Sequence, residues 1–247
     1  MGRRKGVAWL LAIIVVVAVA IAVPLSIDAS GSRVASSSTT GPAGQDNSPV
    51  VAGTGTVIAW NPSHQDDTGP NGWYEYAVCG EIAQLTMALL PDFTNVLSWE
   101  TGTGLASRSE SALESECDQA KAAHAQIFIA VHVNGGAASG FTGLYHTGDS
   151  PSAHYAEALL RSVAATMGMT FFDVKPRSDL FVLDPANNQA PIRVLLELGD
   201  NVADRALLVS EKGQRRLAAA LAKAVDENVP STFRYEQGAA RLAYTGA

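Results

Sequence analysis

The sequence predicts an α/β fold: a single domain with a mostly parallel or mixed central sheet covered by helices. Short runs of β-branched and aromatic residues alternate along the chain with longer segments of helical periodicity, an order typical of such domains. Residues 126–134 form a nearly continuous apolar run, Gln-Ile-Phe-Ile-Ala-Val-His-Val-Asn, which indicates a central strand buried on both faces. With 247 residues, 47% of them apolar, the chain can hold one such domain with appendages.

Residues 1–27 predict a transmembrane or signal helix ahead of this domain. Arg3, Arg4 and Lys5 precede an uncharged apolar stretch at residues 7–27, and about 20 apolar residues suffice to cross a membrane. Small-residue cleavage sites near Ala20 and Ala29 are weak, which favours an uncleaved anchor over a signal peptide. The positive flank then places the domain outside the cytoplasm, anchored to the membrane through this helix or, if the helix is cleaved, secreted.

Composition divides the rest of the chain into three parts. Residues 28–55, rich in Ser, Thr, Gly and Ala, predict a flexible linker; residues 56–228 predict the folded domain, and residues 229–247 a tail without clear periodicity. Residues 1–27 carry three positive charges, those of Arg3, Arg4 and Lys5. Subtracting them from the net charge of −7 leaves −10 for the part of the chain that follows. This acidic balance argues against nucleic acid as a partner.

Three of the predicted strands end beside a histidine or a carboxylate. His64 follows the strand at residues 56–60, His132 lies near the end of residues 126–134, and the strand that begins at Ile192 runs into Glu197. Ligands of open α/β sheets bind at the carboxyl ends of parallel strands, so we expect these side chains at one edge of the sheet. His146, which ends a strand at residues 141–146, is expected at the same edge, either exposed or in contact with substrate.

A carboxylate completes a donor set for a metal ion. Glu75 lies in the first turn of a helix predicted over residues 73–90, beside the loop that carries His64. Two imidazoles and one carboxylate are the protein ligands of catalytic zinc sites that leave a position for water. The spacing is long, unlike the compact His-Glu-x-x-His pattern, so each histidine could instead be hydrogen-bonded in the core.

Glu197 is the candidate general base. Burial at the end of a strand would raise the pKa of its carboxyl group, which suits proton transfer near neutral pH. The alternative is a salt bridge with Arg193 or Arg177.

Other polar and sulfur-containing side chains have less specific interpretations. Cys79 and Cys117 fall on predicted helices, and both a disulfide between them and two buried free thiols stay open.

Residues 180–183 predict a short strand. The glutamates of the helices predicted over residues 73–90 and 107–125 are expected to form solvated faces: Glu81, Glu110, Glu114 and Glu116.

These motifs, in this order, resemble the zinc-dependent N-acetylmuramoyl-L-alanine amidases of type 3 from bacterial cell walls. The resemblance rests on Val-Ile-Ala-Trp-Asn-Pro-Ser-His ending at His64, on Glu75 at a helix start, on Ile-Phe-Ile-Ala-Val-His-Val-Asn around His132, and on Pro-Ile-Arg-Val-Leu-Leu-Glu-Leu-Gly around Glu197. It covers about residues 56–228. It implies that His64, Glu75 and His132 bind Zn²⁺ and that Glu197 is catalytic.

The resemblance also implies a function: zinc-activated hydrolysis of the amide between the lactyl group of N-acetylmuramic acid and L-alanine, with peptidoglycan as substrate. A zinc peptidase acting on stem peptides and a non-catalytic wall-binding module are the alternatives. The chain departs from the family pattern around the first histidine, where Ser63-His64-Gln65-Asp66 replaces Gly-His-Gly-Gly. It also carries Glu116 and Lys121 in place of an arginine and an asparagine, and Asp200 in place of an aromatic residue. Asn201 and Asp204 loosely match the family's downstream Asn and Asp.

Overall fold

The computed structural model describes residues 55–65, 68–69, 72–99, 110–136 and 138–233. The predicted membrane helix, most of the linker and most of the tail lie outside these residues. Within the described part, no helix is both long enough and apolar enough to cross a membrane. The chain divides into the units Met1–Pro49 and Val50–Ala247, and the domain described here belongs to the second.

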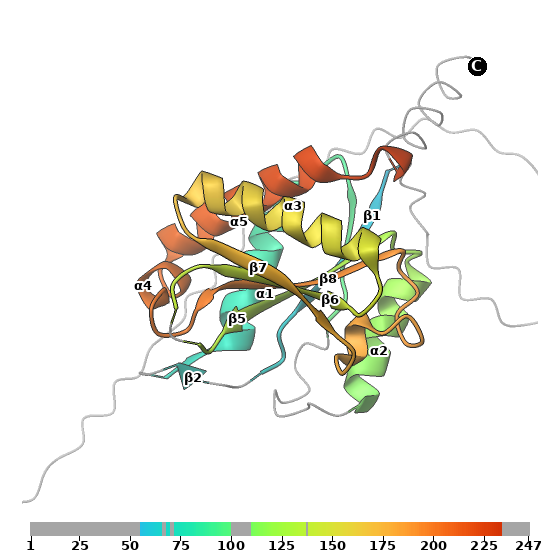
Figure 1. Cartoon of the computed structure of the whole chain (residues 1–247), viewed down its shortest axis with the longest axis horizontal. Coiled ribbons are helices and arrows are strands. Elements are labelled where there is room, and N and C mark those ends of the chain that lie inside the picture. The colour runs from blue at the N-terminus through green and yellow to red at the C-terminus, as the bar shows by residue number, and fades with distance from the viewer. Residues whose placement is uncertain (1–54, 66–67, 70–71, 100–109, 137, 234–247) are drawn as a thin grey trace, which may run out of the picture. The chain divides into compact units, whose positions relative to one another are not determined.

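A six-stranded mixed sheet forms the centre of the domain (Figure 1). Its strands, in spatial order, are β4 (Thr94–Leu97), β1 (Val57–Pro62), β5 (Ile127–Asn134), β8 (Ile192–Asp200), β6 (Phe141–His146) and β7 (Phe171–Arg177). The first four run parallel, β6 runs antiparallel to β8, and β7 runs parallel to β6. The predicted α/β domain with a mixed, helix-covered sheet is confirmed.

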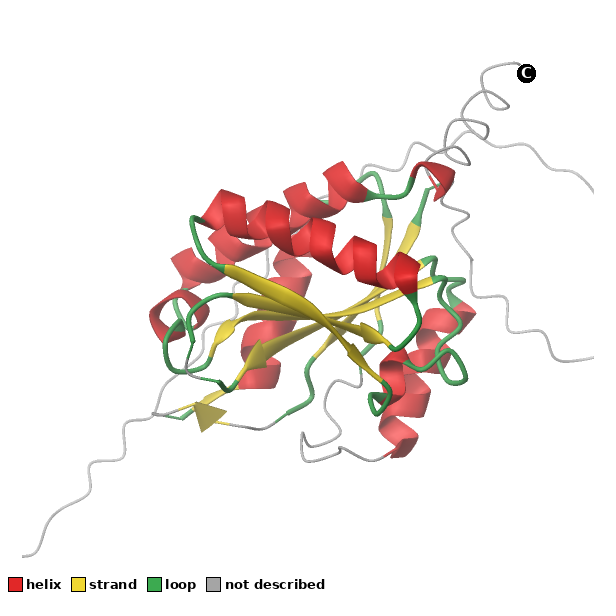
Figure 2. Cartoon of the chain, in the orientation of Figure 1, coloured by secondary structure: helices red, strands yellow, loops and turns green. Residues whose placement is uncertain are grey.

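Helices cover the sheet unequally (Figure 2). One face packs against α1 (Glu75–Ala88), α3 (Ser150–Met167), the short α4 (Arg205–Leu208) and α5 (Glu211–Asn228). The other face packs against α2 (Glu110–Ala122) and the 3₁₀ helix η1 (Phe181–Leu183). Among the described residues, the first face therefore carries the larger of the two apolar cores.

Strand alternation decides which face each site residue occupies. In β5, Ile127, Ile129 and Val131 belong to the larger core, whereas Phe128 and Ala130 belong to the smaller one. Because side chains alternate between faces with a period of two, His132 lies on the face of Phe128. That face is the one covered by α2.

Two predicted elements differ from the structure near the strand β7. Residues 181–183 form the 3₁₀ helix η1 rather than a strand, and β7 was not predicted. It is an edge strand with mostly exposed side chains and contains Pro176, so it lacks the apolar run by which the buried strands are recognised. Proline is tolerated there because an edge strand leaves some of its N–H groups unpaired.

The helix predicted from residue 73 begins two residues later. Trp73 and Tyr74 form the strand β3 (Trp73–Tyr74), which pairs antiparallel with β2 (Thr68–Gly69). The first helical residue is Glu75.

The two cysteines are free and buried, which settles the alternative left open by the sequence. Cys79 on α1 packs in the larger core and Cys117 on α2 packs in the smaller one. The sheet lies between these cores, so the two thiols cannot meet in a disulfide without unfolding.

Candidate active site

The three strands expected to carry the site are neighbours and run in the same direction. Pro62 of β1 pairs with Val131 of β5, and His132 of β5 pairs with Glu197 of β8. The amide of Ser63 extends this pairing by donating to the carbonyl of Val131 at 2.8 Å. The expected gathering of polar side chains at the carboxyl ends of parallel strands is therefore present.

Glu75 reaches this edge from the first turn of α1. Its Oε1 lies 3.1 Å from Nδ1 of His132 and accepts a hydrogen bond from the main-chain N–H of Val133 at 3.3 Å. Glu75 is only 6% exposed. A helix start thus places a buried carboxylate against a buried imidazole of the neighbouring strand.

His64 lies just beyond β1 and has an acidic neighbour on α2. Its Nδ1 is 3.8 Å from Oε2 of Glu116. Across the described ranges, no three His, Cys, Asp or Glu side chains stand close enough to hold one metal ion in their present conformations. The structure thus brings together Glu75 with His132 and His64 with Glu116, and the three-ligand set stays a prediction.

The chemistry of these donors fits a zinc ion. Ligand atoms ~2.0–2.2 Å from a tetrahedral zinc lie roughly 3.3–3.5 Å from one another. Oε1 of Glu75 and Nδ1 of His132 are 3.1 Å apart, slightly closer than that, because a hydrogen bond joins them. Imidazole nitrogen and carboxylate oxygen are the donor types that such sites use.

The charge balance at His132 reflects the carboxylates around it. Burial lowers the pKa of this imidazole, but the hydrogen bond with Glu75 and the negative charges of Glu197, Glu75 and Glu116 outweigh it, so its pKa is raised. Three carboxylates therefore act on one imidazole, and the edge is a strongly negative environment. Such an environment attracts a cation.

Glu197 follows the register of β8 and lies on the same face as His132. Its Oε2 is buried without a hydrogen-bond partner among the described residues. Burial, together with the charge of Glu75, raises the pKa of Glu197, and the positive charges of His132 and Arg177 oppose this rise only in part.

The alternative interpretation of Glu197, a salt bridge with Arg193 or Arg177, is wrong. Arg193 pairs with Asp149 at 2.6 Å, and Arg177 pairs with Asp179 at 2.6 Å. Neither arginine forms an ion pair with Glu197 in the described part of the chain.

Glu116 was expected on a solvated helix face and is instead fully buried beside His64. Its Oε2 accepts a hydrogen bond from Nδ2 of Asn61 at 2.8 Å. Exposure of Glu81 and Glu114 agrees with the prediction. The signal that could have separated Glu116 from them is its place next to Cys117 on the apolar side of α2.

His146 lies away from this edge, so its expected position was wrong. It ends β6, which runs antiparallel to β8: Thr142 pairs with Glu197, and Leu144 with Leu195. Four residues beyond Thr142, His146 therefore lies toward the amino end of β8.

The loop after β8 is fixed by Asp204. Its carboxylate accepts hydrogen bonds from the main-chain N–H groups of Asp200 at 2.9 Å and Gly140 at 3.0 Å, and from the hydroxyl of Ser139. Gly199 has a φ of +118°, and a Cβ there would lie 3.2 Å from the Asp204 side chain. A glycine two residues after Glu197 thus lets the strand turn against Asp204.

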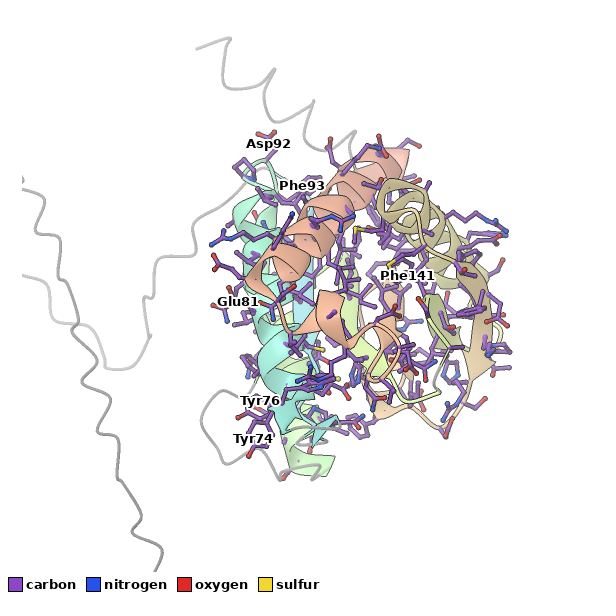
Figure 3. The ribbon with its side chains drawn as sticks, turned by 90° about the vertical axis from the view of Figure 1, so that its left-hand side faces the viewer. Tyr74, Tyr76, Glu81, Asp92, Phe93 and Phe141 are labelled. Carbon is purple, nitrogen blue, oxygen red and sulfur yellow. The ribbon has the colours of Figure 1, made fainter. Side chains whose placement is uncertain are left out.

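Two tyrosines flank Glu75 in sequence and lie at the amino end of α1 (Figure 3). Their rings are stacked with centroids 5.3 Å apart, and Tyr74 is 45% exposed. Asp92 and Phe93 lie beyond the other end of the same helix (Figure 3). The tyrosine pair therefore forms an exposed aromatic surface at the helix end that supplies Glu75.

Fold and site together define an α/β domain with an acidic and imidazole-rich centre at the carboxyl ends of its parallel strands. The profile of the family described as N-acetylmuramoyl-L-alanine amidase, Amidase_3, matches residues 58–227. The chain belongs to this family of amidases, as its motifs indicated. No curated protein sequence matches the chain.

Solved structures of amidases share the fold. The apo N-acetylmuramyl-L-alanine amidase Ami1 from Mycobacterium abscessus is 18% identical with a TM-score of 0.60, covering 71% of this chain and 99% of that one. The catalytic domain of CwlV from Bacillus (Paenibacillus) polymyxa is 20% identical with a TM-score of 0.58, covering 70% and 97%. An N-acetylmuramoyl-L-alanine amidase from Clostridium difficile 630 is 18% identical with a TM-score of 0.59, covering 70% and 96%.

Proposed function

We propose that the protein hydrolyses the amide bond between the lactyl group of N-acetylmuramic acid and L-alanine in peptidoglycan. Family membership supports the reaction class. The observation that carries the proposal is the placement of Glu197 beside His132, which in turn contacts Glu75. A base, an imidazole and a carboxylate are the groups that a metal-assisted amide hydrolysis needs in one place.

We propose Zn²⁺ as the cofactor, held by His64, Glu75 and His132. When bound, zinc would supply a Lewis acid that lowers the pKa of a water to about 7 and polarises the amide carbonyl. The Glu75 and His132 pair supports this assignment, since it holds a carboxylate and an imidazole in contact at this edge of the sheet.

Glu197 acts as the general base and then as the acid. Its buried Oε2 takes a proton from the attacking water, and the same oxygen returns that proton to the nitrogen of the departing L-alanine. Burial raises the pKa of Glu197, which improves its proton affinity for this exchange.

The apolar segment at residues 7–27 supports a location outside the cytoplasm, where peptidoglycan lies. Either a membrane anchor or a cleaved signal would deliver the domain there.

Two other functions make different predictions. A peptidase of the stem peptide would cut between amino acids and leave the lactyl amide intact. A non-catalytic wall-binding module would release nothing, and it would have no use for a buried, unpartnered carboxylate oxygen beside an imidazole.

Digestion of purified muropeptides by the full-length protein, followed by mass analysis, tests the proposal. An amidase yields disaccharides with a free lactyl carboxyl group and intact stem peptides that begin with L-alanine. Shortened stem peptides that stay attached to the glycan would assign the protein to the peptidases, and unchanged muropeptides would indicate a binding module.

A further inference from the structure

A buried carboxylate that the proposed reaction does not use lies beside His64. Glu116, on α2, is fully buried, and its Oε2 lies 3.8 Å from Nδ1 of His64. Burying a carboxylate is costly unless hydrogen bonds or opposite charges compensate. Its position therefore calls for a physical explanation.

Several elements hold this carboxylate in place. Nδ2 of Asn61, on β1, donates to Oε2 of Glu116 at 2.8 Å and to the main-chain oxygen of Ser98 at 2.8 Å. The hydroxyl of Ser98 donates in turn to the main-chain oxygen of Glu116. All three residues are buried, so the carboxylate is fixed relative to the end of β1, from which His64 follows.

Glu116 and Glu75 belong to helices that pack on opposite faces of the sheet. Glu75 begins α1, which packs on the larger core, whereas Glu116 belongs to α2, which packs on the smaller one. Glu75 contacts His132 and Glu116 faces His64. The carboxylate nearest to His64 among these two is therefore that of Glu116.

We infer that Glu116 is a positioning residue of the cation site, whose fixed negative charge orients His64 and increases the affinity of the site for Zn²⁺. This inference rests on the proposed function, because it takes His64 as a ligand. Carboxylates hydrogen-bonded to a metal-binding histidine typically contribute a factor of about 10–100 in metal affinity. At 3.8 Å Glu116 acts on His64 through its charge, so we expect the lower end of that range.

The variant Glu116→Gln separates this role from a structural one. Glutamine keeps the length of the side chain and an oxygen that can accept from Asn61, but it removes the charge that faces His64. Glu114→Gln, two residues away on the exposed side of the same helix, is the matched control. The dissociation constant for Zn²⁺ is measured for the three full-length proteins by competition with a chromogenic chelator, and the Tm of each is measured after metal removal.

The inference predicts that Glu116→Gln weakens zinc binding at least about tenfold, with an unchanged Tm of the metal-free protein, and that Glu114→Gln binds as the unmodified protein does. Binding within twofold of the unmodified protein would overturn it, and so would weaker binding accompanied by a marked loss of Tm, which would indicate a structural role. If zinc binding responds as predicted but no muropeptide is cleaved, the inference stands and the proposed reaction fails.

Discussion

Glu197 and His132 lie directly opposite each other in the parallel pairing of β8 with β5, on the face of the sheet that α2 covers. A register shift of one residue in either strand would turn its side chain to the opposite face, into the larger core. The apolar residues that alternate with them, Val131 and Leu196 among others, prevent such a shift because they are fully buried. The core therefore sets the geometry of the site.

Replacing Glu197 by Gln should reduce hydrolysis of muropeptides at least about 100-fold, because a general base typically contributes a factor of 10²–10⁴. Zinc content should stay the same, since Glu197 is not among the assigned ligands. Rates measured by release of stem peptides, with the exposed Glu81→Gln as control, check this expectation. Unchanged turnover in Glu197→Gln would refute the role assigned to this carboxylate.

The same variant should make the metal-free protein more stable at high pH. The folded protein raises the pKa of Glu197 above its value in the unfolded chain. Between these two values the folded state binds more protons, so its stability falls as pH rises through the folded pKa. Glu197→Gln removes this loss.

Unfolding by urea in the presence of a chelator measures the effect. The stability gained in Glu197→Gln should be largest above the titration range of Glu197 and should vanish below about pH 4, where the carboxyl is protonated in both states. An equal gain at every pH would show that ionisation of Glu197 is not its source.

Both cysteines should be unreactive in the folded protein and reactive after unfolding. Burial raises the pKa of the Cys117 thiol to about 12 and that of Cys79 well above its usual value, where Glu75 and Glu197 raise it further. Only the thiolate reacts with disulfide reagents, so a low thiolate fraction and burial act in the same direction. Titration with such a reagent should find two thiols in denaturant and almost none without it. If the thiols of the unfolded protein react only after a reductant is added, the two cysteines form a disulfide, which would contradict their free state in the structure.

Arg193 should contribute to stability but not directly to the reaction. Its guanidinium binds Asp149 at 2.6 Å and the carbonyl oxygens of Leu183 and Ala190, and the residue is 8% exposed. Arg193→Met would leave Asp149 without this partner. Breaking a fully buried pair typically costs about 3–5 kcal/mol of unfolding free energy, which is an upper bound for this part-buried one.

Arg215, whose pair with Glu211 is exposed, is the matched control. Arg215→Met should cost only about 0.3–0.5 kcal/mol, the usual range for an exposed pair one helical turn apart. Equal losses in the two variants, measured by denaturant unfolding, would contradict the structural role of Arg193.

The sequence was sufficient to predict the buried strands and their polar ends, because burial on both faces leaves a continuous apolar run, as in residues 127–131. It was insufficient for β7, whose side chains are mostly exposed, and for the direction of β6, on which the position of His146 depends. Antiparallel pairing with β8 is a tertiary property that no local pattern in residues 141–146 encodes.

At the candidate site, the burial of Glu116 is the feature that the sequence did not predict. A glutamate on an amphipathic helix is usually solvated, and only the packing of α2 over the ends of β1 and β5 buries this one. The sequence predicted the other four site residues because each lies next to an apolar strand or at a helix start: His64, Glu75, His132 and Glu197. Their distances depend on side-chain conformation, which the sequence does not specify.

Anomalous diffraction at the zinc absorption edge, from crystals of the protein grown with zinc, tests the central claim most directly. We expect one strong peak within about 2.0–2.2 Å of donor atoms of His64, Glu75 and His132, with Glu197 beside it and outside the ligand set. A fully occupied peak elsewhere, or none at this edge of the sheet, would contradict the claim that these residues form a zinc-dependent hydrolytic centre.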